Sequence, residues 1–72
     1  MDVCRRLGQN VRRLREAAGY SQEAFADLAG LHRTYISDIE RGARNPTIRV
    51  VDKLAMAFAV SAGSLLDHVD AS

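Results

Sequence analysis

The residue types best suited to molecular recognition lie in the stretch GLHRTYISDIERG, which runs from Gly30 to Gly42. At about 100° per residue, a helix over this stretch gathers its polar side chains into one arc of roughly 140°. That arc holds Arg33, Ser37, Arg41, Thr34 and Asp38. The other side of the helix holds Tyr35, Ile36 and Ile39. One face can therefore pack on a core, while the other presents a row of hydrogen-bonding groups to a partner.

The elements that must position this row are helices, because apolar residues recur at helical spacing almost throughout the chain. We expect five helices joined by short loops, in an all-α fold. Ser21, Thr47 and Ser61 can cap three of them through their side-chain oxygens. The predicted core consists of Leu7, Val11, Leu14, Phe25, Leu28, Ile36, Ile39, Val51, Leu54, Phe58 and Leu65.

The spacing of small and apolar residues after Gln22 is typical of a helix-turn-helix. Counted from Gln22 as the first position, Ala26 is the fifth and Gly30 the ninth. A small residue is needed where two helices cross steeply, and glycine supplies the positive φ of the short turn. Ile36 and Ile39 then pack the second helix onto the first. Together these offsets make a specific pattern.

The length of 72 residues allows one domain, 1–72, which buries only ~60% of the surface of its unfolded chain. Cys4 is the single cysteine, so an intramolecular disulfide is impossible. No secretory segment and no apolar run of membrane-spanning length are present, which leads us to expect a cytoplasmic protein. Packing alone, or a second copy of the chain, must then stabilise the fold.

Positive charge is concentrated after the polar helix, although the net charge is only +1. Residues 41–53 hold Arg41, Arg44, Arg49 and Lys53 against Asp52 alone. Nine of the ten basic residues are arginine, the better bidentate partner for phosphate and guanine. A GC-rich genome explains the number of arginines equally well, but not their position.

An enzymatic function is not expected. His32 and Ser37 are five residues apart on one helix and about 140° out of alignment, so they cannot form a nucleophile–base pair. The two histidines and Cys4 lack the spacing of a zinc site. We therefore expect no catalytic residue, no metal, no cofactor and no small-molecule ligand.

The string LREAAGYSQEAFADLAGLHRTYISDIERGARNPTIRVVDKLAMAF resembles the Cro/repressor-type helix-turn-helix family, also called XRE. The resemblance covers about residues 6–67 and implies a compact, five-helix, lambda-repressor-like DNA-binding domain with its helix-turn-helix at about 22–41. Within the family, GLHRTYISDIERGARNPT is most similar to the controller proteins of restriction–modification systems. Double-stranded DNA is the partner that this resemblance implies.

In this architecture the second helix of the motif enters the major groove, so its polar arc should face base edges. Arg33 is the best candidate for guanine, and Thr34 can donate to a base or meet a thymine methyl. Ser37 lies one turn further on and is a further candidate for a base contact. Asp38 can accept from cytosine N4 but repels phosphate, and the controller proteins carry a small residue there; its alternative role is to hold Thr34 or Arg41 in place.

The remaining polar residues are expected to bind the DNA backbone or to stabilise the fold. By the resemblance, Arg44 reaches a base in or beside the minor groove. The phosphate contacts are expected from Gln22, Tyr35, Arg41, Asn45 and Arg49. Arg15 and Glu40 resemble a buried salt bridge of the family that ties the first helix to the third.

The last two helices carry more apolar residues than one small core needs, which predicts a homodimer on a palindromic operator. The expected interface consists of Val50, Met56, Leu65, Leu66 and Val69. An antitoxin or phage-type autorepressor with the same motif, and a protein-interaction module without DNA binding, stay open as alternatives. RNA polymerase is a further partner that Glu23 and Asp27 can contact, although a solvated face explains them as well.

Overall fold

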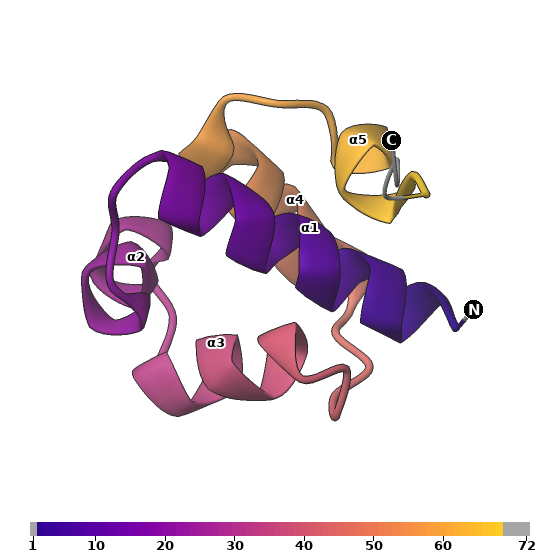
Figure 1. Cartoon of the computed structure of the whole chain (residues 1–72), viewed down its shortest axis with the longest axis horizontal. Helices are drawn as coiled ribbons and strands as arrows, with labels where there is room; N and C mark the ends of the chain where they lie inside the picture. Colours follow the sequence, from indigo (N-terminus) through magenta and orange to yellow (C-terminus); the bar gives the residue numbers. More distant parts are fainter. Residues whose placement is uncertain (1, 69–72) are drawn as a thin grey trace.

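The computed structural model describes residues 2–68 and consists, over that range, of five α-helices without a strand. The helices are α1 (Val3–Ala17), α2 (Gln22–Ala29), α3 (Arg33–Glu40), α4 (Ile48–Phe58) and α5 (Ala62–Leu66). Figure 1 shows α1 crossing the molecule, with α4 behind it and with α2 and α3 at one end and along one side. The all-α, five-helix fold is thus confirmed.

The three predicted caps form. Ser21, Thr47 and Ser61 each accept a hydrogen bond on the side-chain oxygen from the backbone N–H three residues later, at 3.0, 3.2 and 3.2 Å. Asp2 also caps a helix, α1, through its side chain, and this cap was not predicted. The third helix differs, because His32 occupies its cap position without a side-chain hydrogen bond.

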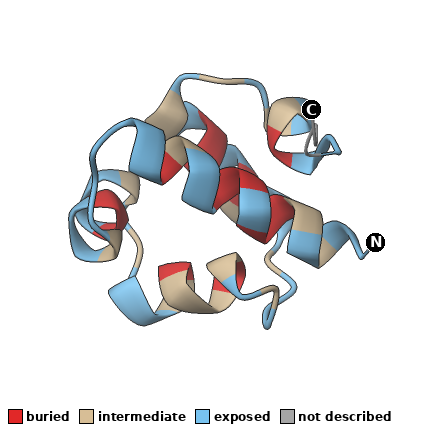
Figure 2. Cartoon of the chain, viewed as in Figure 1, coloured by how far each residue is buried: buried red, intermediate tan, exposed pale blue. Residues whose placement is uncertain are grey.

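The core lies between α1, α2, α3 and α4, with Leu65 of α5 closing it (Figure 2). Phe25 is fully buried and stacks on Phe58, with 4.3 Å between ring centroids. The prediction was wrong for Leu28, which is 51% exposed and lines a shallow hollow between α2 and α4. Leu14 and Phe58 are partly buried against the core, and Ala26 and Ala55 belong to it as well.

Asn10 is a buried polar residue that holds α5 against α1. Its side-chain nitrogen donates to the carbonyl oxygens of Leu65 at 2.8 Å and Asp67 at 2.9 Å. Its side-chain oxygen accepts from Arg13 at 3.2 Å. Helical periodicity distinguishes apolar from polar positions only, so it could not predict a polar side chain that satisfies carbonyls at the end of another helix.

No helix within residues 2–68 is both long enough and apolar enough to cross a membrane.

Candidate nucleic-acid interface

The turn between α2 and α3 has the predicted geometry of a helix-turn-helix. Gly30 adopts φ +71°, and the next backbone N–H, that of Leu31, donates to the carbonyl oxygen of Ala26 at 2.9 Å. Ala26 is 1% exposed in the core beside Ile36 and Ile39. A larger residue at this position would need space that the close-packed interior does not contain.

The polar side of α3 remains accessible to a ligand. Arg33 and Thr34 are exposed, and Ser37 is half-buried. Their neighbours Ile36 and Ile39 are 0% and 1% exposed. The helix therefore presents its hydrogen-bonding groups outward from a rigid support, which is the arrangement that reading base edges requires.

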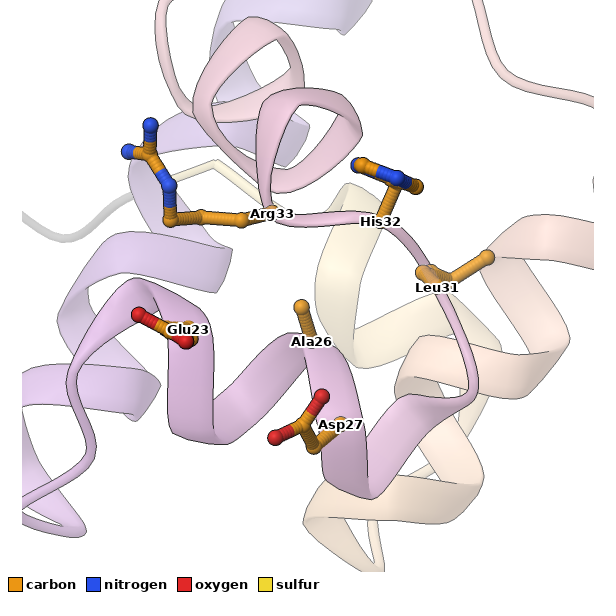
Figure 3. A pocket seen from close by; sticks show the side chains of 6 residues that line it. All are labelled: Glu23, Ala26, Asp27, Leu31, His32 and Arg33. Carbon is orange, nitrogen blue, oxygen red and sulfur yellow. The ribbon is translucent and has the colours of Figure 1, made fainter.

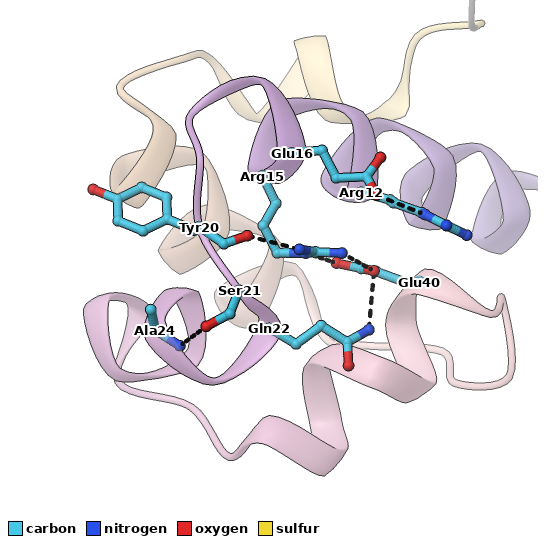
Figure 4. A network of polar contacts seen from close by, with 8 residues as sticks. All are labelled: Arg12, Arg15, Glu16, Tyr20, Ser21, Gln22, Ala24 and Glu40. Carbon is cyan, nitrogen blue, oxygen red and sulfur yellow. Dashed lines mark hydrogen bonds and ion pairs between the residues drawn. The ribbon is translucent and has the colours of Figure 1, made fainter.

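Arg15 and Glu40 form the buried ion pair that the family resemblance implies (Figure 4). Two parallel hydrogen bonds join them, from Nε to Oε2 at 2.6 Å and from Nη2 to Oε1 at 3.0 Å. Arg15 also donates to the carbonyl oxygen of Tyr20 at 2.7 Å. The pair thereby ties α1, the following loop and the end of α3 together.

The hydrogen bond to Glu40 raises the pKa of Arg15, against the opposing effect of burial, and the negative charge of Glu40 adds to the rise. The guanidinium is therefore always charged here. Its partner carboxylate is also bonded by Gln22, whose Nε2 lies 3.1 Å from Oε1 of Glu40. An amide nitrogen carries two hydrogens, so Gln22 at the start of α2 retains a donor for a phosphate.

Both carboxylate oxygens of Asp38 contact arginine side chains. Its Oδ1 pairs with Arg41, and its Oδ2 lies 3.2 Å from Nη2 of Arg44. Arg44 in turn lies over the ring of Tyr35, with its Cζ 4.4 Å from the ring centroid. The contact to Arg41 is one of the two alternative roles expected of Asp38, whereas its contact to Arg44 was missed because no local pattern relates residues six apart across a turn.

The turn that returns Arg44 to α3 is a Schellman motif. The N–H of Gly42 donates to Ile39 at 3.0 Å, and the N–H of Ala43 donates to Asp38 at 2.9 Å. Gly42 has φ +71°, which glycine adopts without strain.

Two other residues predicted to bind the DNA backbone, Asn45 and Arg49, lie outside α3. Asn45 is exposed after the turn, and its side-chain oxygen lies 4.0 Å from the sulfur of Cys4 on α1. Arg49 is exposed in the first turn of α4 and lines a shallow groove with Asp52 and with Ala62 of α5. Arg41 and Arg44 are therefore grouped with α3, whereas Arg49 lies on the side of α4 that faces α5.

A shallow hollow lies at the junction of α2 and α3. Figure 3 shows Glu23 and Asp27 on α2 beside His32 and Arg33 at the start of α3. Both carboxylates are exposed. Among residues 2–68, three or more His, Cys, Asp or Glu side chains do not come together as a metal site. Charged side chains from both helices therefore line the hollow.

The predicted dimer surface needs correction at Leu65, which is 0% exposed because it closes the core of its own chain. Met56 and Leu66 are 73% and 38% exposed, so both remain accessible to a second copy of the chain. Val50 is partly buried against the core, and Val69 lies outside the described residues.

Ile48 is a further exposed apolar residue of α4. It is 85% exposed because it begins the helix, where no neighbouring element covers it. At about 100° per residue, Ile48, Asp52 and Met56 fall within roughly 80° of one another on α4. An exposed stripe therefore runs along the outer side of this helix.

Comparison with known proteins points to the same motif. A family model described as helix-turn-helix, HTH_3, matches residues 11–65. The control protein C.SmaI of Serratia marcescens is 44% identical over 66 residues, which span 92% of this chain and 79% of that protein.

Two solved structures extend the comparison. The restriction-modification controller protein C.AhdI of Aeromonas hydrophila superposes with a TM-score of 0.82 at 42% identity, covering 86% of this chain and 94% of that one. SinR, the master regulator for biofilm formation, solved in complex with DNA, gives a TM-score of 0.80 at 37% identity, covering 85% of this chain and 98% of that one.

Proposed function

Because this chain belongs to the HTH_3 family of helix-turn-helix proteins, the Cro/repressor or XRE type, we propose that it is a sequence-specific DNA-binding transcriptional regulator. The observation that carries the proposal is the division of α3, whose Arg33 and Thr34 are exposed while Ile36 and Ile39 are buried. The similarity to C.SmaI and C.AhdI favours the restriction–modification controller type, and SinR is a relative solved with DNA.

In the proposed complex, α3 lies in the major groove. Arg33 donates its planar fork to guanine O6 and N7, and Thr34 contacts the neighbouring base. Ser37, one turn further along and half-buried, is the third residue of α3 proposed to contact a base. Arg44 reaches the adjacent groove from its place on the ring of Tyr35.

Contacts to the sugar–phosphate backbone fix the helix in register. The proposed contacts come from the start of α2, from α3 and the turn after it, and from α4: Gln22, Tyr35, Arg41, Asn45 and Arg49. Each cation that neutralises a phosphate releases counterions, so affinity should fall steeply with salt.

A homodimer on a palindromic operator completes the proposal, since two copies would read half-sites about 34 Å apart. The exposed residues Ile48, Met56 and Leu66 supply apolar area for the contact. The acidic side chains of Glu23 and Asp27 remain exposed for RNA polymerase if the regulator activates transcription.

The experiment that tests this function is selection of bound duplexes from a random DNA pool, followed by affinity measurements on the enriched sequence. We expect one motif with twofold symmetry. Arg33→Ala should relax the preference at the guanine position of that motif, at a cost of about 1–3 kcal/mol for the lost bidentate contact. Arg12→Ala is the matched control, because Arg12 is an exposed arginine on α1 that pairs with Glu16.

The outcomes separate the alternatives. A pool without enrichment at any ionic strength would leave the protein-interaction module as the better explanation. An enriched operator together with a stable complex with a small toxin would identify the antitoxin type. Equal effects of Arg33→Ala and Arg12→Ala would show that α3 is not the reading element.

A further inference from the structure

Asp38 is a negatively charged residue on the proposed DNA-binding surface, where a negative charge is unexpected. It places a carboxylate on the polar side of α3, which should meet DNA phosphates of the same sign. It also lies in the last turn of α3, which ends at Glu40. The dipole of a helix disfavours negative charge at that end. Two unfavourable electrostatic effects therefore act on one side chain.

Both oxygens of Asp38 are occupied by cations that offset these effects. Arg41 pairs with Oδ1 and Arg44 with Oδ2. The carboxylate side chain is 20% exposed, whereas Arg41 and Arg44 are 64% and 46% exposed. The cluster thus carries a net charge of +1 in place of the +2 of the two arginines.

Arg44 is held from two directions. The face of the Tyr35 ring attracts its guanidinium at 4.4 Å, and the Asp38 carboxylate fixes one end of the fork at 3.2 Å. The Schellman turn through Gly42 brings the backbone of Arg44 to this place. Because a guanidinium has five N–H donors, Arg44 keeps donors for DNA while these contacts persist.

We propose that Asp38 is a specificity-determining residue that restrains Arg41 and Arg44 from binding phosphates of arbitrary DNA. The inference rests on the proposed DNA-binding function. On a non-specific duplex nearly all attraction is between cations and phosphates, and the carboxylate of Asp38 opposes that attraction for both arginines. On the operator, the contacts of Arg33 to base edges add attraction that Asp38 does not oppose, because its ion pairs are with Arg41 and Arg44. The restraint therefore weakens non-specific binding more than operator binding.

The test compares the full chain with Asp38→Asn on the selected operator and on a scrambled duplex of equal length, over a range of salt concentrations. We expect Asp38→Asn to bind the scrambled duplex about tenfold more tightly, with less than a threefold change on the operator. The plot of log K against log salt for the scrambled duplex should steepen by about one for each additional phosphate that the released arginines neutralise.

Glu16→Gln is the matched control. It also removes one carboxylate from an arginine pair, that with Arg12 on α1, where side chains are 55% and 65% exposed. Its ratio of operator to scrambled affinity should equal that of the unaltered chain. Thermal melting of each variant tests whether it is folded.

Three outcomes would overturn the inference. An unaltered ratio in Asp38→Asn would show that the arginines are not restrained. Loss of operator binding with no tighter binding of the scrambled duplex would mean that Asp38 reads a base directly. If the unaltered chain itself prefers no sequence, the proposed function fails as well, which the first measurement reveals separately.

Discussion

Gly8 of α1 packs directly against the carbonyl oxygen of Ile39 on α3. A Cβ atom at Gly8 would overlap that oxygen and would lie 2.8 Å from the carbonyl oxygen of Glu40. Both neighbours are backbone atoms, so neither can rotate away. The absence of a side chain at Gly8 therefore sets how closely α3 approaches the centre of the domain.

We predict that Gly8→Ala destabilises the protein, although alanine normally favours a helix over glycine. Overpacking costs about 1–3 kcal/mol, and rigid backbone neighbours place this substitution at the upper end. For a domain of this size the melting temperature should fall by roughly 10 °C or more. Gly63→Ala in α5 is the control, because open space surrounds that position. Its melting temperature should stay equal or rise; equal losses in both variants would contradict the prediction.

Breaking the Arg15–Glu40 pair from one side should be severely destabilising. Arg15→Leu or Glu40→Leu leaves the other charge buried and unpaired, at a cost of about 3–5 kcal/mol. The double variant should be less destabilised than the sum of the two, which a double-mutant cycle by urea unfolding measures. The same cycle on the exposed pair Arg12–Glu16 should give a coupling below about 1 kcal/mol.

The raised pKa of Arg15 determines the pH dependence of this pair on its basic side. The folded pKa lies above the unfolded one, so the stabilisation is complete below the unfolded pKa and is lost only as pH rises through the folded value. Stability measured between about pH 7 and 10 should therefore show no loss from this guanidinium.

A backbone substitution should stabilise the protein. Ala59 ends α4 with φ 58°, the left-handed region that costs a residue with a Cβ atom about 1–2 kcal/mol. Ala59→Gly removes this strain but adds unfolded-state entropy, for a net gain of roughly 0.5–1 kcal/mol. Gly30→Ala should destabilise the protein, because Gly30 has φ +71°, which strains a residue with a Cβ atom. Open space surrounds this position, so the loss would come from backbone strain and not from a steric clash. Calorimetric melting of both variants tests the pair; a lower melting temperature for Ala59→Gly would refute the explanation.

Helical periodicity and capping residues were sufficient to predict the number of helices and the helix-turn-helix. Ala26, Gly30, Ile36 and Ile39 have the burial or the φ angle that their spacing predicts. These features are local, because they depend on residues close together along the chain. Leu28 shows the limit of the method, since an apolar type does not reveal which side of a short helix faces solvent.

The polar contacts of the candidate site depend on tertiary geometry and were predicted less completely. Arg15 and Glu40 are 25 residues apart, and only the family resemblance paired them. The contacts of Asp38 with Arg44, and of Asn10 with carbonyls near the end of α5, were not predicted. A side chain can satisfy such partners only once the chain has folded, so spacing alone cannot indicate them.

The last prediction concerns the outer side of α4. Polar substitutions there should weaken dimer formation without unfolding the monomer. Ile48 and Met56 are 85% and 73% exposed, so Ile48→Asp and Met56→Lys should alter the free energy of unfolding of the monomer by about 0.5 kcal/mol or less. If this side of α4 forms the dimer contact, both variants should sediment as monomers at concentrations where the unaltered chain is dimeric. Both variants should also bind the operator more weakly, because a monomer contacts only one of the two half-sites.

Leu65 provides the contrasting case for the same experiment. It is 0% exposed, so Leu65→Asp buries a charge in the core and should unfold the chain rather than dissociate it. Circular dichroism distinguishes the two results, because a monomeric variant keeps its helical spectrum and an unfolded one does not. A dimer that survives both Ile48→Asp and Met56→Lys would place the interface elsewhere on the surface. Leu66 would then be tested next, because it is the other residue of the expected set that is exposed within residues 2–68.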